Sequence, residues 1–374
     1  MERRKVVLRQ DAEERVARVT ALTLGCPFCG ASLGSLAGGA YEPGMMCTCG
    51  AVVHSVTGGP RWDSAPGALA DAYREIRTRV VSTVQGHEDA IARLSLMAAR
   101  HLHLGGRQRA LVIGPSGTGK TTLAVALAEA LDCPLAIWDV SVSSEAGWAG
   151  VDLAVVMAEL YEACDGSLER MSRSILVLDE ADKIAVGDTV GVAKAHKRGQ
   201  QKSLLAVLGG GVPTRFQADG DRGSALAVRT DDMMILGLGA FEGLRPDPSP
   251  SDLVAYGYMV ELASRFPVIV SLSRLQPAAL MTVLERAAAE AIEPVVEFGF
   301  DIRVTRPAVR YAVDALERGD PSLTTRAAIG WLQAAVDAVL LKLLDLGAPV
   351  GTRYEITPDD VAIPRALRAQ RPRG

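Results

Sequence analysis

The stretch that decides the fold is Ala110-Leu-Val-Ile-Gly-Pro-Ser-Gly-Thr-Gly-Lys-Thr-Thr122. Its four apolar residues, Ala110 to Ile113, predict a buried strand, and the apolar-periodic run from Leu123 to Leu131 predicts a helix. Between them, residues 114–121 fill every fixed position of the phosphate-binding loop pattern. A chance glycine turn would not be framed by a strand and a helix in this way. The stretch therefore predicts an α/β domain with a nucleotide site.

The residue types of this loop suit a phosphate ligand. Glycines let backbone N–H groups converge on a phosphate without Cβ clashes, and the helix N-terminus adds its positive dipole end. We expect Lys120 to reach the β- and γ-phosphates of ATP and the Thr121 hydroxyl to bind Mg²⁺. The loop residues expected to contact the nucleotide are Gly114, Pro115, Ser116, Gly117, Thr118, Gly119, Lys120, Thr121 and Thr122.

A second apolar strand, Ile175-Leu-Val-Leu-Asp-Glu180, ends in two carboxylates. Asp179 is expected to hold the Mg²⁺ through water, and Glu180 to orient and activate the attacking water. An ordinary strand that ends in an acidic turn is the alternative. Because the phosphate-binding loop lies about sixty residues upstream, the nucleotide site is the favoured interpretation.

Composition limits the class of protein. The 374 residues have room for two or three domains, and 48% of them are hydrophobic. A net charge of −4 gives no overall support for nucleic-acid binding, although a local basic patch remains compatible with it. No apolar run reaches membrane-spanning length, and Met1 to Thr20 lacks the apolar core of a signal peptide. We expect a soluble cytoplasmic protein without a membrane partner.

Four of the six cysteines lie close together near the N-terminus. Cys26 and Cys29 form a CxxC pair, and Cys47 and Cys49 form a CxC pair, each followed by glycine. Four thiolates suit a closed, structural Zn²⁺ site, so these cysteines are the expected zinc ligands. The second pair is one residue short of ideal spacing, which leaves His54 as a substitute ligand and metal-free cysteines as the alternative.

The rest of the chain alternates helical and strand patterns before it turns helical. Residues 68–101 predict helices interrupted by a turn at 84–87, and further strands are expected at 134–140 and 233–241. Residues 185–199 predict a polar, basic loop before a helix at 200–208, and residues 212–231 a loop or hairpin. After Ser271 we expect helices, one of which opens at Arg326 and presents an apolar face at helical spacing.

For two residues, the position in the sequence does not decide between two possible roles. Arg265 lies where a helix meets a strand and could simply satisfy the end of its own helix. Trp148 lies between glycines, where a large aromatic side chain either packs as an anchor or is presented to a ligand.

From about Leu69 to Val361 the sequence resembles the AAA+ ATPases and, among them, the ClpX family of protein unfoldases. Several motifs in register carry the resemblance, in addition to the phosphate-binding loop followed by Leu123-Ala124. They are Val84-Gln85-Gly86, Glu145-Ala-Gly-Trp-Ala-Gly150, Leu178-Asp-Glu-Ala-Asp-Lys-Ile184, Gln200-Gln-Lys-Ser-Leu-Leu205, Gly239-Ala-Phe-Glu-Gly-Leu244 and the segment from Asp252 to Pro267.

The resemblance assigns roles by position. It implies that Val84 and Gln85 line the adenine pocket, that Arg326 contacts nucleotide within its own subunit, and that Arg265 is an arginine finger for the neighbouring subunit. It implies a homo-hexamer that acts on protein substrates with a pore loop formed by Gly147, Trp148, Ala149 and Gly150. The N-terminal cysteines match the family's zinc module in position, which implies recruitment of substrates or adaptors there.

Two departures from the family bear on partners. The long loop with an Ile-Gly-Phe tripeptide, by which ClpX docks onto the ClpP peptidase, is replaced by the short interval Arg245 to Ser251. The basic Arg-Lys-His loop at the pore entrance is also absent; Arg215, Asp219, Asp221 and Arg222 occupy that interval. These departures argue against ClpP docking by that route and predict a different choice of substrate.

The expected architecture is a wound parallel sheet with a helical domain after it. The expected units are an arm at 1–20, a zinc-binding module at 21–58, a linker at 59–68, a large α/β ATPase domain at 69–271, a small helical domain at 272–365 and a basic tail at 366–374. The leading functional hypothesis is an ATP-dependent, ring-forming protein unfoldase independent of ClpP. The alternatives are an unfoldase subunit of a protease through another dock, a nucleic-acid motor or loader, and a non-hydrolysing scaffold.

Overall fold

A computed structural model describes residues 68–104, 106–141, 149–187, 189–209, 214–217, 226–318 and 324–361, together with short strands before residue 68. These strands, β1 (Thr23–Gly25), β2 (Ser32–Ser35), β3 (Met45–Met46) and β4 (Val52–Val53), pair as two antiparallel ladders, β1 with β2 and β3 with β4. Cys26, Cys29, Cys47, Cys49 and His54 lie outside the described residues. The zinc site therefore stays a prediction.

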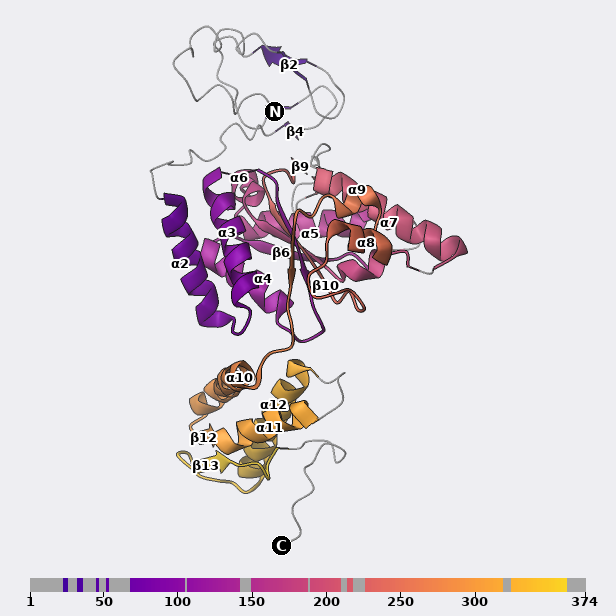
Figure 1. Cartoon of the computed structure of the whole chain (residues 1–374). Coiled ribbons are helices and arrows are strands. Elements are labelled where there is room, and N and C mark those ends of the chain that lie inside the picture. Colours follow the sequence, from indigo (N-terminus) through magenta and orange to yellow (C-terminus); the bar gives the residue numbers. More distant parts are fainter. Residues whose placement is uncertain are drawn as a thin grey trace.

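A five-stranded parallel sheet forms the centre of the α/β unit (Figure 1). Its spatial order is β11 (Val268–Ser271), β5 (Gln108–Ile113), β10 (Met234–Gly239), β7 (Ile175–Asp179) and β6 (Leu135–Asp139). All four pairings are parallel. The expectation of a wound parallel sheet is confirmed, with the strand of the phosphate-binding loop, β5, inside the sheet.

Both faces of the sheet are covered, which is why its strands are almost continuously apolar. Alternate residues of β5 enter different cores: Ala110 and Val112 pack with one cluster, Leu111 and Ile113 with the other. The first cluster contains α2 (Ala68–Thr83), α3 (Glu88–Leu104) and α4 (Lys120–Leu131). The second contains α5 (Ala149–Ala163) and α7 (Gly191–Gly209), so Figure 1 shows a three-layer unit.

Shorter elements connect these layers. They are α6 (Leu168–Ser172), the 3₁₀ turn η2 (Ala181–Ile184), the hairpin β8 (Thr214–Phe216) and β9 (Leu226–Val228), α8 (Pro250–Tyr256) and α9 (Val260–Ala263). The interruption expected between the first two helices is confirmed, because α2 ends at Thr83 and α3 begins at Glu88.

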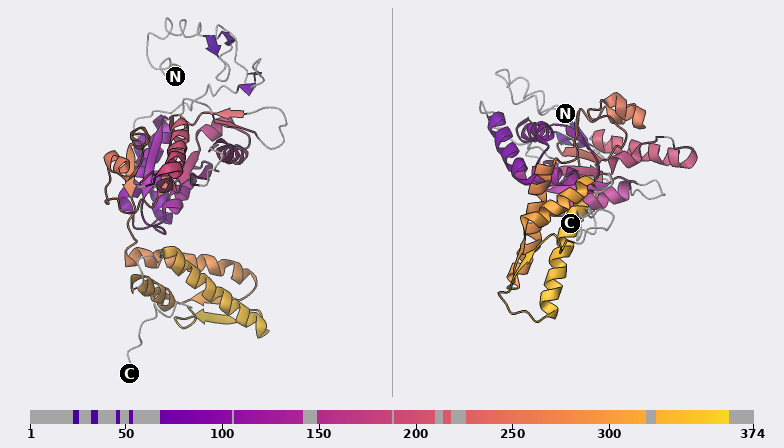
Figure 2. Two further views of the ribbon diagram at one scale, coloured as in Figure 1. Left: turned by 90° about the vertical axis from the view of Figure 1, so that its right-hand side faces the viewer. Right: turned by 60° about the horizontal axis from the view of Figure 1, so that its bottom comes forward.

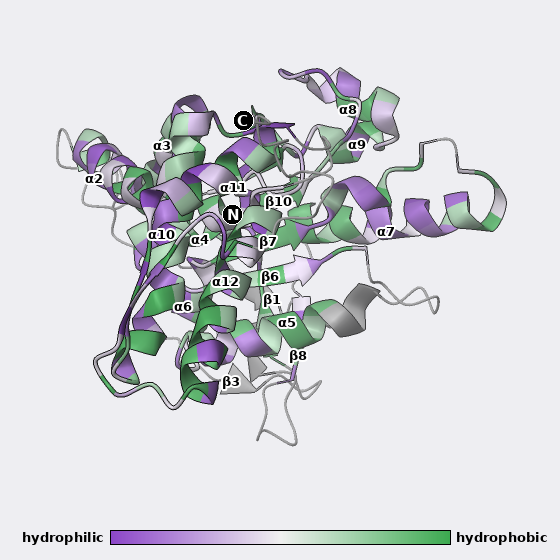
Figure 3. Cartoon of the chain, turned by 90° about the horizontal axis from the view of Figure 1, so that it is seen from below, coloured by the Kyte–Doolittle hydropathy of each residue, from purple (hydrophilic) through white to green (hydrophobic). Residues whose placement is uncertain are grey.

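The expectation of a loop over residues 185–199 is wrong for most of its length, since α7 begins at Gly191. The helix carries no proline, and Ala193, Lys194 and Ala195 favour helix. Its later turns bury Gln201 and Leu204 against the sheet, so packing there supports the helix from its C-terminal half. The basic run is therefore an exposed helical end, which Figure 3 shows extending away from the body.

The C-terminal unit contains more than helices. It consists of α10 (Pro277–Glu297), β12 (Asp301–Val304), α11 (Arg306–Arg318), α12 (Thr325–Asp345) and β13 (Arg353–Ile356), with β12 and β13 paired in parallel. The strand pair was not foreseen from the sequence. Figure 2 shows this unit below the α/β unit, joined by the segment that leaves β11.

The apolar face expected on the last helix is present in α12. Its residues Leu332, Val336, Val339 and Leu343 are buried in the core of the C-terminal unit. Among the described helices, α12 is also the one that is long and apolar enough to cross a membrane by length and composition. Of that apolar window, 33% is buried, where the apolar face of α12 packs against α10 and α11.

Candidate nucleotide site

The phosphate-binding loop joins the end of β5 to the start of α4. Gly117 and Gly119 have φ values of +78° and +89°, a region that side-chain-bearing residues rarely adopt. Gly119 is the N-cap of α4 and supplies no side-chain hydrogen bond, so the first N–H groups of α4 have no side-chain cap. These donors and the positive end of the helix dipole form a cradle for an anion.

Lys120 lies at the centre of this cradle. Its Nζ donates to the carbonyl oxygens of Gly114 at 2.6 Å and Pro115 at 3.0 Å. Burial lowers the pKa of Lys120, while the nearby carboxylates of Asp179, Asp182 and Glu180 oppose that shift and Arg326 adds to it. Lys120 therefore lies close enough to Asp179, Glu180 and Arg326 for their charges to act on it.

The two carboxylates follow directly from β7. Asp179 is its last residue, and its Oδ1 accepts a hydrogen bond from the Glu180 N–H at 2.9 Å. Glu180 is exposed and has a φ of +54°, a left-handed conformation that is costly for a residue other than glycine. Such strain concentrates at functional sites. Here it directs the chain away from the sheet immediately after Asp179.

Two buried polar residues at the site were missed from the sequence. The Nε2 of His87 is 2.9 Å from the Thr118 carbonyl oxygen, which ties the start of α3 to the phosphate-binding loop. Asp182 is buried within η2, and its Oδ1 accepts from the Ala240 N–H at 3.1 Å. The only signals in the sequence were a histidine beside the predicted Val84-Gln85-Gly86 turn and a third acid after Asp179 and Glu180.

The C-terminal unit reaches both sides of the loop. A Cβ added at Gly117 would lie 2.5 Å from the Cβ of Thr324, the N-cap of α12, so the phosphate-binding loop and the start of α12 are in contact there. Arg286 of α10 donates to the Thr83 carbonyl oxygen at 2.7 Å and to that of Ser82, at the end of α2. Helices α10 and α12 therefore contact the end of α2 and the phosphate-binding loop.

The residues expected at the adenine pocket lie at that junction. Val84 is buried, and Gln85 donates from Nε2 to the Val81 carbonyl oxygen at 2.8 Å. Gly86 follows with a φ of +78°, and a Cβ there would lie 3.1 Å from the Cβ of Ala279. The turn is thus packed between the two units.

Arg265 is not part of this cluster. It lies between α9 and β11, at the end of the sheet opposite the phosphate-binding loop. The six residues of β5 span roughly 16–17 Å between those ends at about 3.3 Å per residue. The neighbour of Arg265 is Arg109 of β5, whose pKa is lowered to about 10 by burial first and then by Arg107 and Arg265.

The expected pore loop is mostly outside the described residues. Gly147 and Trp148 are among the residues that the structure does not describe, while Ala149 and Gly150 begin α5. The orientation of Trp148 therefore stays a prediction.

The donor set suits Mg²⁺ held together with a nucleotide. Among the described residues, no group of three His, Cys, Asp or Glu side chains could hold a metal by itself. Mg²⁺ prefers a few protein oxygens combined with phosphate oxygens and water, which Thr121 and Asp179 can provide beside the cradle. Thr121 is exposed in the first turn of α4, and Asp179 is half-buried.

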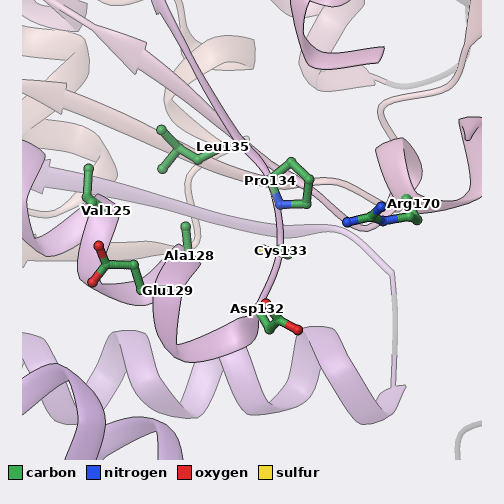
Figure 4. Close-up of a pocket in the computed structure, with 8 residues that line it drawn as sticks. All are labelled: Val125, Ala128, Glu129, Asp132, Cys133, Pro134, Leu135 and Arg170. Atoms are coloured by element: carbon green, nitrogen blue, oxygen red, sulfur yellow. The ribbon is translucent and has the colours of Figure 1, made fainter. Parts of the chain in front are cut away.

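A pocket elsewhere is separate from this site. Figure 4 shows it between the end of α4 and the start of β6. Its lining includes Glu129, Asp132, Cys133 and Arg170. Because α4 has 12 residues, this end lies roughly 17 Å from Lys120. The pocket is therefore not the nucleotide site.

Comparison with known proteins agrees with the geometry. Residues 110–220 match the ATPase family associated with various cellular activities (AAA). Over 312 residues, the chain is 27% identical to the ATP-dependent Clp protease ATP-binding subunit ClpX of Borrelia duttonii, a match that covers 70% of this chain and 72% of that protein.

Two further relatives match over shorter lengths. Identity is 29% to ClpX 3 of Methylococcus capsulatus and 30% to ClpX 2 of Wolinella succinogenes. These matches cover 59% and 54% of the respective relatives, so the chain spans a little over half of their lengths. Together with the cradle around Lys120 and the carboxylates that follow β7, these matches show that residues 110–220 are similar to the AAA ATPase domain and that the chain is similar to ClpX proteins.

Proposed function

We propose that this chain forms a ring, a homo-hexamer, that uses ATP hydrolysis to unfold or disassemble protein substrates in the cytoplasm. The observation that carries the proposal is the separation of Arg265 from the other charged groups of the site. Lys120, Asp179, Glu180 and Arg326 share one end of the sheet, and Arg265 lies at the other. An arginine at that end of the sheet is too far from the nucleotide of its own subunit to act on it, which supports a role in the site of a neighbouring subunit.

Within this proposal each residue has a defined role. Mg²⁺, when bound with ATP, neutralises charge on the β- and γ-phosphates. Lys120 and the loop N–H groups would bind those phosphates, and Thr121, with Asp179 acting through water, would hold the ion. Glu180 accepts the proton of the attacking water, and Arg265 of the adjacent subunit stabilises the charge that develops. Arg326 reports the state of the site to the C-terminal unit.

Contacts between the two units support the conversion of hydrolysis into movement. Thr324 of α12 lies against Gly117 of the loop, and Arg286 of α10 is bonded to the end of α2, so the C-terminal unit is attached to the loop and to the helix before it. We propose that the resulting rotation moves the Trp148 loop along the axis of the ring. An aromatic side chain gives contact area with any polypeptide without needing a particular sequence.

We also propose that the ring works without the ClpP peptidase. The interval at 245–251 is a compact start of α8: Ser249 and Asp252 form a capping box, and the Arg245 Nε lies 3.1 Å from the Asp252 Oδ2. That local structure offers no extended docking loop. The N-terminal module, with zinc on Cys26, Cys29, Cys47 and Cys49, is proposed to recruit substrates or an adaptor.

Mixed rings test the central proposal. Arg265→Ala and Lys120→Ala proteins are each expected to hydrolyse ATP at under about a hundredth of the wild-type rate, given the roughly 10³–10⁵-fold effect of an arginine finger. In an equal mixture, about a quarter of the sites join an intact Lys120 to an intact Arg265, so about a quarter of the wild-type rate should return. If the mixture stayed as inactive as its components, a finger supplied by a neighbour would be excluded.

A further inference from the structure

Gln201 is a buried polar residue that the nucleotide chemistry does not use. It lies on the face of α7 that otherwise buries Leu204, Val207 and Leu208, and none of its surface is exposed. Its Nε2 donates to the carbonyl oxygens of Ile184 and Gly257, both at 2.9 Å, and its Oε1 accepts from the Met259 N–H at 2.6 Å. A buried amide is costly unless it is satisfied in this way.

The partners of Gln201 belong to two functional segments. Ile184 ends η2, the turn that begins directly after Glu180. Gly257 and Met259 precede α9, which leads straight to Arg265. One side chain therefore joins the turn of the hydrolytic carboxylate to the segment of the arginine finger.

Tyr258 makes a second bridge between the same segments. Its hydroxyl donates to the Ala181 carbonyl oxygen at 2.6 Å, in a position where only 3% of the residue is exposed. Its ring lies 5.7 Å, centroid to centroid, from that of Phe241, which follows β10. The hydroxyl can thus be removed while the ring stays packed.

The backbone after η2 and the backbone before α9 are in close contact. The Val186 N–H donates to the Gly257 carbonyl oxygen at 3.0 Å, and a Cβ at Gly257 would lie only 2.3 Å from the Gly187 nitrogen. A displacement of the turn after Glu180 must therefore move the finger segment with it.

We propose that Gln201 and Tyr258 are positioning residues that fix Arg265 relative to the Glu180 turn of the same subunit. Through them, each subunit sets the geometry of the arginine that it supplies to its neighbour. This inference rests on the proposed function, in which Arg265 acts across the subunit boundary. It predicts that weakening the bridge harms the neighbour's site more than the subunit's own.

The test uses mixed rings of two kinds of subunit. The donor carries Lys120→Ala and keeps its finger, and the hydrolysing subunit carries Arg265→Ala and keeps its phosphate-binding loop. Only a donor finger in a hydrolysing site produces turnover. Tyr258→Phe is then added to one kind or the other, and kcat and KM for ATP are measured.

With Tyr258→Phe in the donor, we expect the recovered kcat to fall about tenfold with KM within about twofold, since small misplacements of a catalytic group cost up to about 10²-fold. With the same change in the hydrolysing subunit, the rate should stay within about twofold. Equal losses in both placements, or no loss in the donor, would overturn the proposal. If the unmodified pair recovers nothing, the neighbour-supplied finger itself has failed.

Two further variants test whether the loss of rate comes from altered positioning of Arg265 or only from lower stability. Tyr354→Phe removes a hydroxyl that donates to the Asp360 Oδ1 at 3.1 Å within the C-terminal unit, and it should show no difference between donor and hydrolysing subunits. Gln201→Met removes all three bonds of the other bridge and should repeat the asymmetry of Tyr258→Phe. Thermal unfolding of each variant separates lost stability from lost positioning.

Discussion

At the scale of single residues, two buried histidines make the stability of the α/β unit depend on pH. Burial is the largest cause that lowers the pKa of both His87 and His101, although each ring nitrogen Nε2 contacts a backbone carbonyl oxygen. An unfolded histidine has a pKa near 6.5, so below about that pH the unfolded chain binds more protons than the folded one. Stability is therefore full above about pH 6.5 and falls as the pH drops toward the folded pKa values.

We expect the midpoint of thermal unfolding to fall by on the order of a few degrees between pH 7.5 and 5.5. His101→Gln keeps a donor for the Arg173 carbonyl oxygen, which lies 2.9 Å from the histidine Nε2, but removes the titration. This variant should show a smaller fall over the same interval, measured by calorimetry. An equal fall in the variant and the wild type would exclude His101 as a source of the pH dependence.

Short motifs in the sequence were enough to select Lys120, Asp179 and Glu180, and in the structure Lys120 lies within electrostatic reach of both carboxylates. Their roles in hydrolysis stay predictions. His87 could not be found in this way, because its partner Thr118 lies 31 residues away and no motif encodes that contact. Buried polar bridges between distant segments depend on packing, which periodicity does not reveal.

At the scale of elements, α7 shows where local patterns mislead. Its exposed half carries Lys194, His196, Lys197 and Arg198 without an apolar stripe, so composition favoured a loop. The segment is nevertheless helical, because its residues have sufficient helix propensity and its later turns are buried around Gln201. The parallel pair β12 and β13 was missed for a related reason: two four-residue strands separated by two helices leave little trace in sequence.

The exposed half of α7 should be only locally stable. Ala193→Gly combined with Ala195→Gly removes roughly 2 kcal/mol of helix propensity from a first turn in which residues 191–195 are all exposed. We expect faster hydrogen exchange over residues 191–198 and an unchanged midpoint of thermal unfolding. As a control, Ala312→Gly falls on a buried residue of α11 and should lower the midpoint. If the double variant lowered the midpoint as much as the control, this half of α7 would belong to the cooperative core.

At the scale of the whole molecule, the distribution of charged groups matters more than any one of them. The α/β unit holds Lys120 and Glu180 at one end of its sheet and Arg265 at the other, and Thr324 and Arg286 of the C-terminal unit make their described contacts at the first end. Under the proposed function, a single subunit has a nucleotide site without an arginine finger and an arginine that its own site does not use. Ring formation would complete each site with the arginine of a neighbour, which is the physical reason to expect closed symmetry.

The final prediction concerns how such a ring would grip its substrate. Trp148 lies between two glycines, and a ring that pulls on polypeptide needs an apolar contact that accepts any side chain. Trp148→Ala should keep ATP hydrolysis within about twofold, because the residue lies outside the nucleotide machinery, but reduce unfolding of a fluorescent protein substrate at least about tenfold. Trp148→Tyr, which restores the residue type of the resembled family, should retain most unfolding. If Trp148→Ala unfolded substrate at the wild-type rate per ATP hydrolysed, force would have to reach the polypeptide through another surface of the ring.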